Sequence, residues 1–87
     1  MRTREELEKN LEMTDDEVEH YFPGAINLLL AKVLQKKHFI TENDKFFDTM
    51  FRCDDRDLHA TIVINADEDR YANLTYHGIK KNWAFSF

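Results

Sequence analysis

Hydrophobic positions follow two different spacings along this chain, and the change comes about halfway. In the first half they recur every three or four residues, which is typical of amphipathic helices. In the second half they alternate with polar residues, which is typical of half-buried strands. The sequence therefore predicts an α+β fold, with N-terminal helices packed on one face of a four-stranded antiparallel β-meander. We expect a single domain over 1–87, made of an acidic helical segment at 1–22, a core helix at 24–38 and the meander at 45–87.

Two short helices are predicted in the acidic segment, each opened by the same local motif. Thr3 and Thr14 are both followed three positions later by a glutamate, which is the spacing of a capping box. The helices should then run over about 4–12 and 15–22. The first carries only two leucines on one side, a stripe too narrow to bury deeply, so we expect it to lie on the surface or to fray.

The core helix has the clearest helical pattern in the chain. Its apolar residues follow the i, i+3, i+4, i+7 spacing of a single buried face. The residues predicted to face the sheet are Ile26, Leu29, Leu30, Val33 and Leu34. Pro23 separates this helix from the one before it, because proline lacks an amide donor and suits the first turn of a new helix.

Four strands are predicted in the second half, separated by short polar segments. They cover about 45–53, 58–66, 70–77 and 83–87. Facing residues of an antiparallel hairpin point to the same side of the sheet, so the alternation of apolar and polar residues restricts the pairing. The even-numbered residues of the two middle strands should face the core helix, and their odd-numbered residues should form a mostly polar outer face.

This restriction predicts the register of two hairpins. In the first hairpin Arg52 should lie opposite His59. In the second, with 67–69 as the loop, His59 should lie opposite His77. A two-residue slip of the second hairpin would keep the same residues on each face.

All of the net charge belongs to the beginning of the chain. The formal charge is −5, and residues 1–20 hold eight acidic side chains against three basic ones, whereas the remaining nine of each sign cancel. The candidates for a protein-binding surface are Glu5, Glu8, Glu12, Asp15, Asp16 and Glu19. Such carboxylates can imitate nucleic acid in the basic cleft of a partner; the alternative is a solvated face that keeps a small protein soluble. The negative charge argues against direct nucleic-acid binding, which depends on Lys and Arg.

Two histidines form a second candidate site. If His59 and His77 face each other, their Cβ atoms lie about 5 Å apart, and the imidazoles can flank a phosphate as acid and base while Arg52 holds the anion. This arrangement would indicate a small ribonuclease or a ligand-binding protein. The alternative is a set of ordinary polar residues on a solvated sheet. Two imidazoles without a third ligand do not hold zinc stably, so we expect no metal.

The outer sheet face is also more apolar than solvation requires. Phe46, Met50 and Tyr71 are predicted to lie on it, and exposed aromatic and methionine side chains often mark a protein contact. Either the two acidic helices fold over this face, or it binds a partner, including a second copy of this chain.

The single cysteine and the absence of long apolar runs bear on location. Cys53 has no second cysteine with which to form an internal disulfide, so a reducing, cytosolic location is expected. No secretory signal is expected, because the first residues are charged. The longest apolar run, 28–31, is far shorter than the about 20 residues of a membrane span.

These patterns predict a small acidic cytosolic protein that binds another protein and is not an enzyme. The leading hypothesis is an inhibitor, of the nucleic-acid-mimicking or the immunity and anti-defence type, that acts without a cofactor. The fold itself does not decide the function, since a helix on a four-stranded sheet occurs in small inhibitors, immunity proteins and ribonucleases alike.

Overall fold

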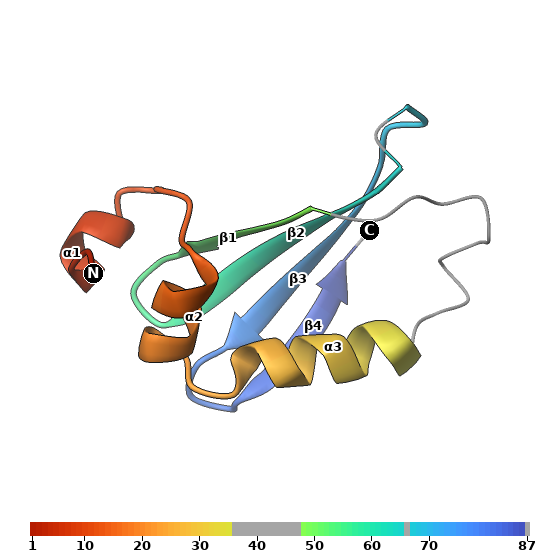
Figure 1. The fold of residues 1–87 in the computed structure, drawn as a ribbon. Helices are drawn as coiled ribbons and strands as arrows, with labels where there is room; N and C mark the ends of the chain where they lie inside the picture. Colours follow the sequence, from red (N-terminus) through yellow and green to blue (C-terminus); the bar gives the residue numbers. More distant parts are fainter. Residues whose placement is uncertain (36–47, 66, 87) are drawn as a thin grey trace.

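Three helices and one four-stranded sheet make up the computed structural model, which describes residues 1–35, 48–65 and 67–86. The helices are α1 (Arg4–Leu7), α2 (Asp15–Tyr21) and α3 (Ala25–Gln35), and the strands are β1 (Thr49–Cys53), β2 (Asp57–Asn65), β3 (Arg70–His77) and β4 (Asn82–Ser86). The strands pair antiparallel in the order β1-β2-β3-β4 (Figure 1), which confirms the α+β prediction. Predictions for 36–47, and with them Phe46, lie outside the described residues.

The two faces of the sheet differ as the alternation predicts. Apart from Arg70 at the start of β3, the even-numbered residues of the middle strands point inward and are buried: Leu58, Ala60, Ile62, Ile64, Ala72, Leu74 and Tyr76. The helices α2 and α3 cover this inner face (Figure 1), and their buried apolar residues belong to the same hydrophobic cluster. None of the helices in the described ranges is long and apolar enough to cross a bilayer.

The first hairpin has the predicted register, but the second does not. Arg52 lies opposite His59, as expected. In the second hairpin, however, His59 lies opposite Thr75, and His77 lies opposite Asp57. This is the two-residue slip that keeps the same faces. It accompanies a register irregularity between Val63 and Asn65 at the loop end of the hairpin, where β2 holds one residue more than β3.

The helix α3 turns a different set of leucines toward the sheet than its pattern predicts. Ala25 and Leu29 are buried, and Ile26 and Val33 pack against the core. Leu30 and Leu34 are 56% and 70% exposed, so their predicted place in the core is wrong. The start of α3 is joined to the sheet by a hydrogen bond of 3.1 Å, which Trp83 Nε1 donates to the carbonyl oxygen of Ala25.

The helix α1 is shorter and more deeply buried than predicted. It ends at Leu7, whose side chain is fully buried in the common core. The chain then turns through Asn10, which has a left-handed backbone with φ of 64°. Met13 pairs with Phe51, since its amide donates to the Phe51 carbonyl over 2.7 Å. The connection between α1 and α2 therefore lies along the outer edge of β1.

Candidate functional site

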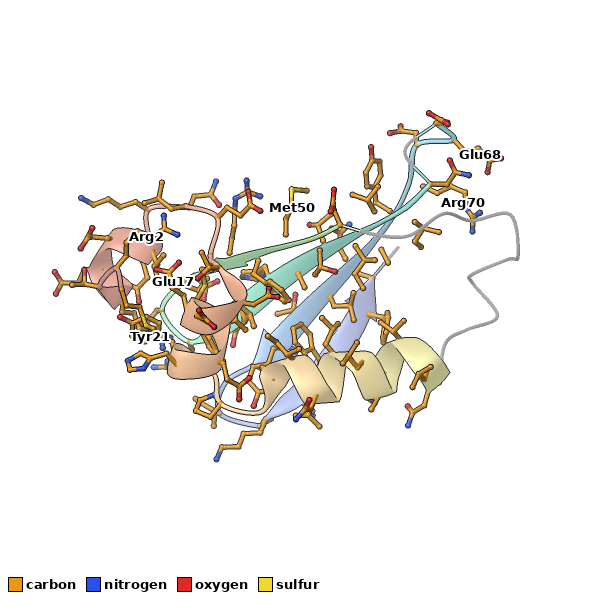
Figure 2. All side chains as sticks on the ribbon, viewed as in Figure 1. Arg2, Glu17, Tyr21, Met50, Glu68 and Arg70 are labelled. Atoms are coloured by element: carbon orange, nitrogen blue, oxygen red, sulfur yellow. The ribbon has the colours of Figure 1, made fainter. Side chains whose placement is uncertain are left out.

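An ion pair between Arg2 and Glu17 holds the acidic N-terminal segment together. The guanidinium Nη2 of Arg2 lies 2.7 Å from Glu17 Oε1, and the same nitrogen donates to the carbonyl oxygen of Glu12 at 2.7 Å. The hydroxyl of Tyr21 donates to the carbonyl oxygen of Arg2 at 2.6 Å. Figure 2 shows Arg2, Glu17 and Tyr21 gathered between α1 and α2. The start of the chain is thereby fixed to α2.

Both predicted capping boxes are present, and one of them is tied to this ion pair. The amide of Glu17 donates to Thr14 Oγ1 over 3.2 Å, and the amide of Thr14 donates to Glu17 Oε1 over 3.0 Å. The hydrogen bond from Arg2, with that from the Thr14 backbone, lowers the pKa of Glu17 from 4.5 to about 2. At the first box, hydrogen bonds from Thr3 lower the pKa of Glu6.

The acidic side chains of this segment divide into two groups. Four are engaged within the fold: Glu6 and Glu17 in the capping boxes, Glu8 with Arg4 Nε at 3.3 Å, and Glu19 with the amide of Gly24 at 3.0 Å. The other four are exposed, and within the described ranges their side chains have no hydrogen-bond or ion-pair partner: Glu5, Glu12, Asp15 and Asp16. We call these four residues the acidic surface. All four belong to the six acidic residues predicted as a protein-binding surface; the other two, Glu8 and Glu19, are engaged within the fold.

The outer face of the sheet is not covered by α1 or α2. Both helices contribute a buried apolar side chain, Leu7 and Val18, to the core on the other side. On the outer face Tyr71 is 39% exposed and Asn73 is exposed, whereas Met50 is half-buried beside the α1–α2 connection. Of the two alternatives for this face, the one in which both helices fold over it is wrong for the described part of the chain.

The predicted pair of facing histidines is not formed. His59 Nε2 lies 2.8 Å from Asp54 Oδ2, and its Nδ1 lies 3.4 Å from Thr75 Oγ1. His77 has its own carboxylate, with Nδ1 3.9 Å from an oxygen of Asp57. The slip of the second hairpin moves the two histidines to diagonal positions on neighbouring strands, a spacing of about 7–8 Å along the backbone instead of about 5 Å. The hydrogen bond with His59 lowers the pKa of Asp54.

A pocket of about 320 Å³ opens where the α1–α2 connection meets the outer face of β1 and β2. Arg52 lies in it, as does its cross-strand neighbour His59. Sequence reasoning selected both residues but missed Asn10, which forms part of the pocket wall. No pattern in the sequence points to Asn10, because the contact depends on how residues 8–13 lie along β1. No three His, Cys, Asp or Glu side chains gather as a metal site in the part of the chain that the structure describes.

The described residues form an α+β fold that carries exposed, unpaired carboxylates on its N-terminal segment and a small pocket on the outer face of β1 and β2. No family model, curated protein or solved structure matches this chain.

Proposed function

We propose that this protein acts by binding another protein, with the acidic surface placed against a basic cleft. In this role it is an inhibitor, because the bound carboxylates compete with whatever anionic ligand the cleft normally holds. The observation that carries the proposal is the division of the acidic residues. Four carboxylates stabilise the segment, and Glu5, Glu12, Asp15 and Asp16 are left exposed on it.

A fixed scaffold supports this use of the exposed carboxylates. The two capping boxes, the Arg2–Glu17 ion pair and the Met13–Phe51 bridge hold the segment against the core. Binding then orders little backbone, which preserves binding free energy. Unpaired carboxylates also attract a basic partner over several ångströms and raise the association rate. The competing histidine hypothesis loses the facing imidazoles on which it depended.

A cytosolic setting is part of the proposal. It is supported by Cys53, the one cysteine of the chain, which is buried as a free thiol in the core. Burial raises the pKa of this thiol, so it is a poor nucleophile and a structural residue.

The test compares two variants that remove the same number of charges from different places. The first neutralises the acidic surface: Glu5→Gln, Glu12→Gln, Asp15→Asn and Asp16→Asn. The matched control neutralises four exposed acids in the two loops that flank β2: Asp55→Asn, Asp67→Asn, Glu68→Gln and Asp69→Asn. Both variants carry the same formal charge, so a difference between them reports the position of the charges.

The tagged wild-type protein is used to isolate its partner from the cells that encode it, and association rates are then measured against salt concentration. We expect the acidic-surface variant to associate about tenfold more slowly at low salt and to lose most of the salt dependence. The control should stay close to wild type. Equal association rates for all three proteins would contradict the proposal. So would a pull-down in which the acidic-surface variant retains every protein that the wild type retains.

The fold of each variant is checked by thermal unfolding. Asp15 and Asp16 lie in the first turn of α2, where a negative charge stabilises a helix by about 0.3–1 kcal/mol. A small decrease in stability is therefore expected for the acidic-surface variant and does not account for a tenfold change in association.

A further inference from the structure

Arg52 is the unusual residue of the pocket on the outer face. The pocket is about 320 Å³ in volume and is lined by Glu8, Asn10, Met50, Arg52, Cys53, Asp54, His59 and Thr61. The Nε atom of Arg52 is buried and has no hydrogen-bond partner among the described residues. A buried donor without an acceptor costs free energy, and native proteins seldom retain one without a reason.

Both carboxylates of the pocket are already engaged with other groups. Glu8 pairs with Arg4 at 3.3 Å. One oxygen of Asp54 lies 2.8 Å from His59 Nε2, and the other accepts the amides of Arg56 and Asp57 at 3.2 and 3.0 Å. The guanidinium of Arg52 is the one charge of the pocket that has no such partner within the described ranges.

Asn10 offers a second polar group beside Arg52. Its side chain has no partner within the described part of the chain, and it lines the same pocket from the α1–α2 connection. Thr61 donates its hydroxyl to Asn73 at 3.1 Å, so it supplies only an acceptor. The donors that the pocket offers to a ligand are thus the terminal nitrogens of the Arg52 guanidinium and the amide of Asn10, because Arg52 Nε, although unpartnered, is buried.

We propose that this pocket binds a small monocarboxylate through the guanidinium of Arg52, with Asn10 as the second donor. A guanidinium presents parallel N–H donors that match the two oxygens of a carboxylate. Met50 lines the pocket with an apolar side chain, so the favoured ligand carries an apolar substituent. This site is separate from the acidic surface and does not depend on the proposed function.

The charge balance favours a monoanion over a phosphate. Arg52 has no ion pair of its own among the described residues, whereas Glu8 is paired with Arg4 and Asp54 with His59, and both carboxylates line the same pocket. A singly charged carboxylate neutralises Arg52 without excess. A phosphate monoester, which carries nearly two negative charges at neutral pH, would face both carboxylates with a single cation in place.

The experiment is a titration of the ¹⁵N-labelled protein followed by NMR, with the Arg52 Nε–H signal as the direct readout. The probes are butyrate and benzoate, their neutral amides butyramide and benzamide, and inorganic phosphate. We expect the two carboxylates to shift the Arg52 Nε–H signal in a saturable way and the amides to leave it unchanged. Arg52→Met should weaken carboxylate binding by about tenfold or more, since a charged hydrogen bond is lost. The matched control Arg56→Met removes an exposed arginine outside the pocket and should bind as wild type does.

A second variant keeps the proposal testable if Arg52→Met fails to fold. Asn10→Gly preserves the left-handed backbone at φ 64° and removes only the amide side chain. It should weaken carboxylate binding several-fold and leave the backbone spectrum of the sheet unchanged. No saturable shift of the Arg52 signal, equal binding by the Arg52 variant, or phosphate binding more tightly than the carboxylates would each overturn the proposal.

Discussion

At the scale of single residues, the ion pair between Arg2 and Glu17 joins the start of the chain to α2. The side chain of Glu17 is only 5% exposed, yet it is held ionised by Arg2 and by its own capping box. A buried carboxylate is tolerated when each of its oxygens has a donor. Glu17 therefore does two tasks, since it caps α2 and anchors the start of the chain.

The acid titration of stability should report this residue. The pKa of Glu17 is about 2 in the folded protein and about 4.5 ordinarily. Its contribution to stability is complete above about pH 4.5 and is lost as the pH falls through 2. The variant Glu17→Gln can still cap the helix but cannot titrate. Urea unfolding measured across this pH range should show a shallower decline for the variant than for wild type. Parallel curves would mean that the Arg2 contact does not hold Glu17 ionised.

At the scale of elements, α3 shows that the spacing of apolar residues along a helix does not by itself determine which of them are buried. Leu29 and Leu34 both belong to the same apolar stripe, but only Leu29 is buried. The hydrogen bond from Trp83 to the carbonyl oxygen of Ala25 is a contact with a distant strand that the spacing within the helix does not contain.

Two leucine truncations on α3 should therefore have unequal effects. Leu29→Ala removes a buried side chain and should lower the free energy of unfolding by about 2–5 kcal/mol. Leu34→Ala, which makes the same chemical change at an exposed position, should alter it by no more than about 0.5 kcal/mol. Denaturant unfolding of both variants measures the difference. Equal losses would show that the helix turns both leucines toward the core.

At the scale of the whole molecule, the acidic segment and the sheet share one core. Leu7 and Met13 lie in the same buried cluster as Phe51 and Trp83. The segment is therefore part of the folded unit and is not an appendage on its surface. Two-state unfolding is expected for a unit of this size with one core.

A truncation in α1 should then affect the entire molecule. Leu7→Ala should lower the free energy of unfolding by about 2–5 kcal/mol, because the side chain is fully buried. Far-ultraviolet circular dichroism and the fluorescence of Trp83 should shift together in one transition. The control Leu11→Ala, four residues along and exposed, should have little effect. Loss of helical signal before the Trp83 transition would indicate that α1 unfolds separately.

The sequence by itself determined the features that depend on neighbouring residues. The capping boxes at Thr3 and Thr14 involve groups three positions apart, so the helix starts could be predicted. The two faces of the sheet follow from the strict alternation of side chains in a strand. The register of the first hairpin followed as well, since the described pairs join Cys53 to Leu58 and Arg52 to His59 as the alternation requires.

Tertiary structure decided what depends on distant groups. The slip of the second hairpin preserves both faces, so the pattern could not distinguish it from the predicted register, and His59 and His77 are separated as a result. The Arg2–Glu17 ion pair spans 15 positions, and the pocket around Arg52 needs the α1–α2 connection beside β1. Such contacts join residues that are far apart in the sequence. Which of them form depends on which arrangement of the whole chain buries the most apolar surface and leaves the fewest polar groups without partners.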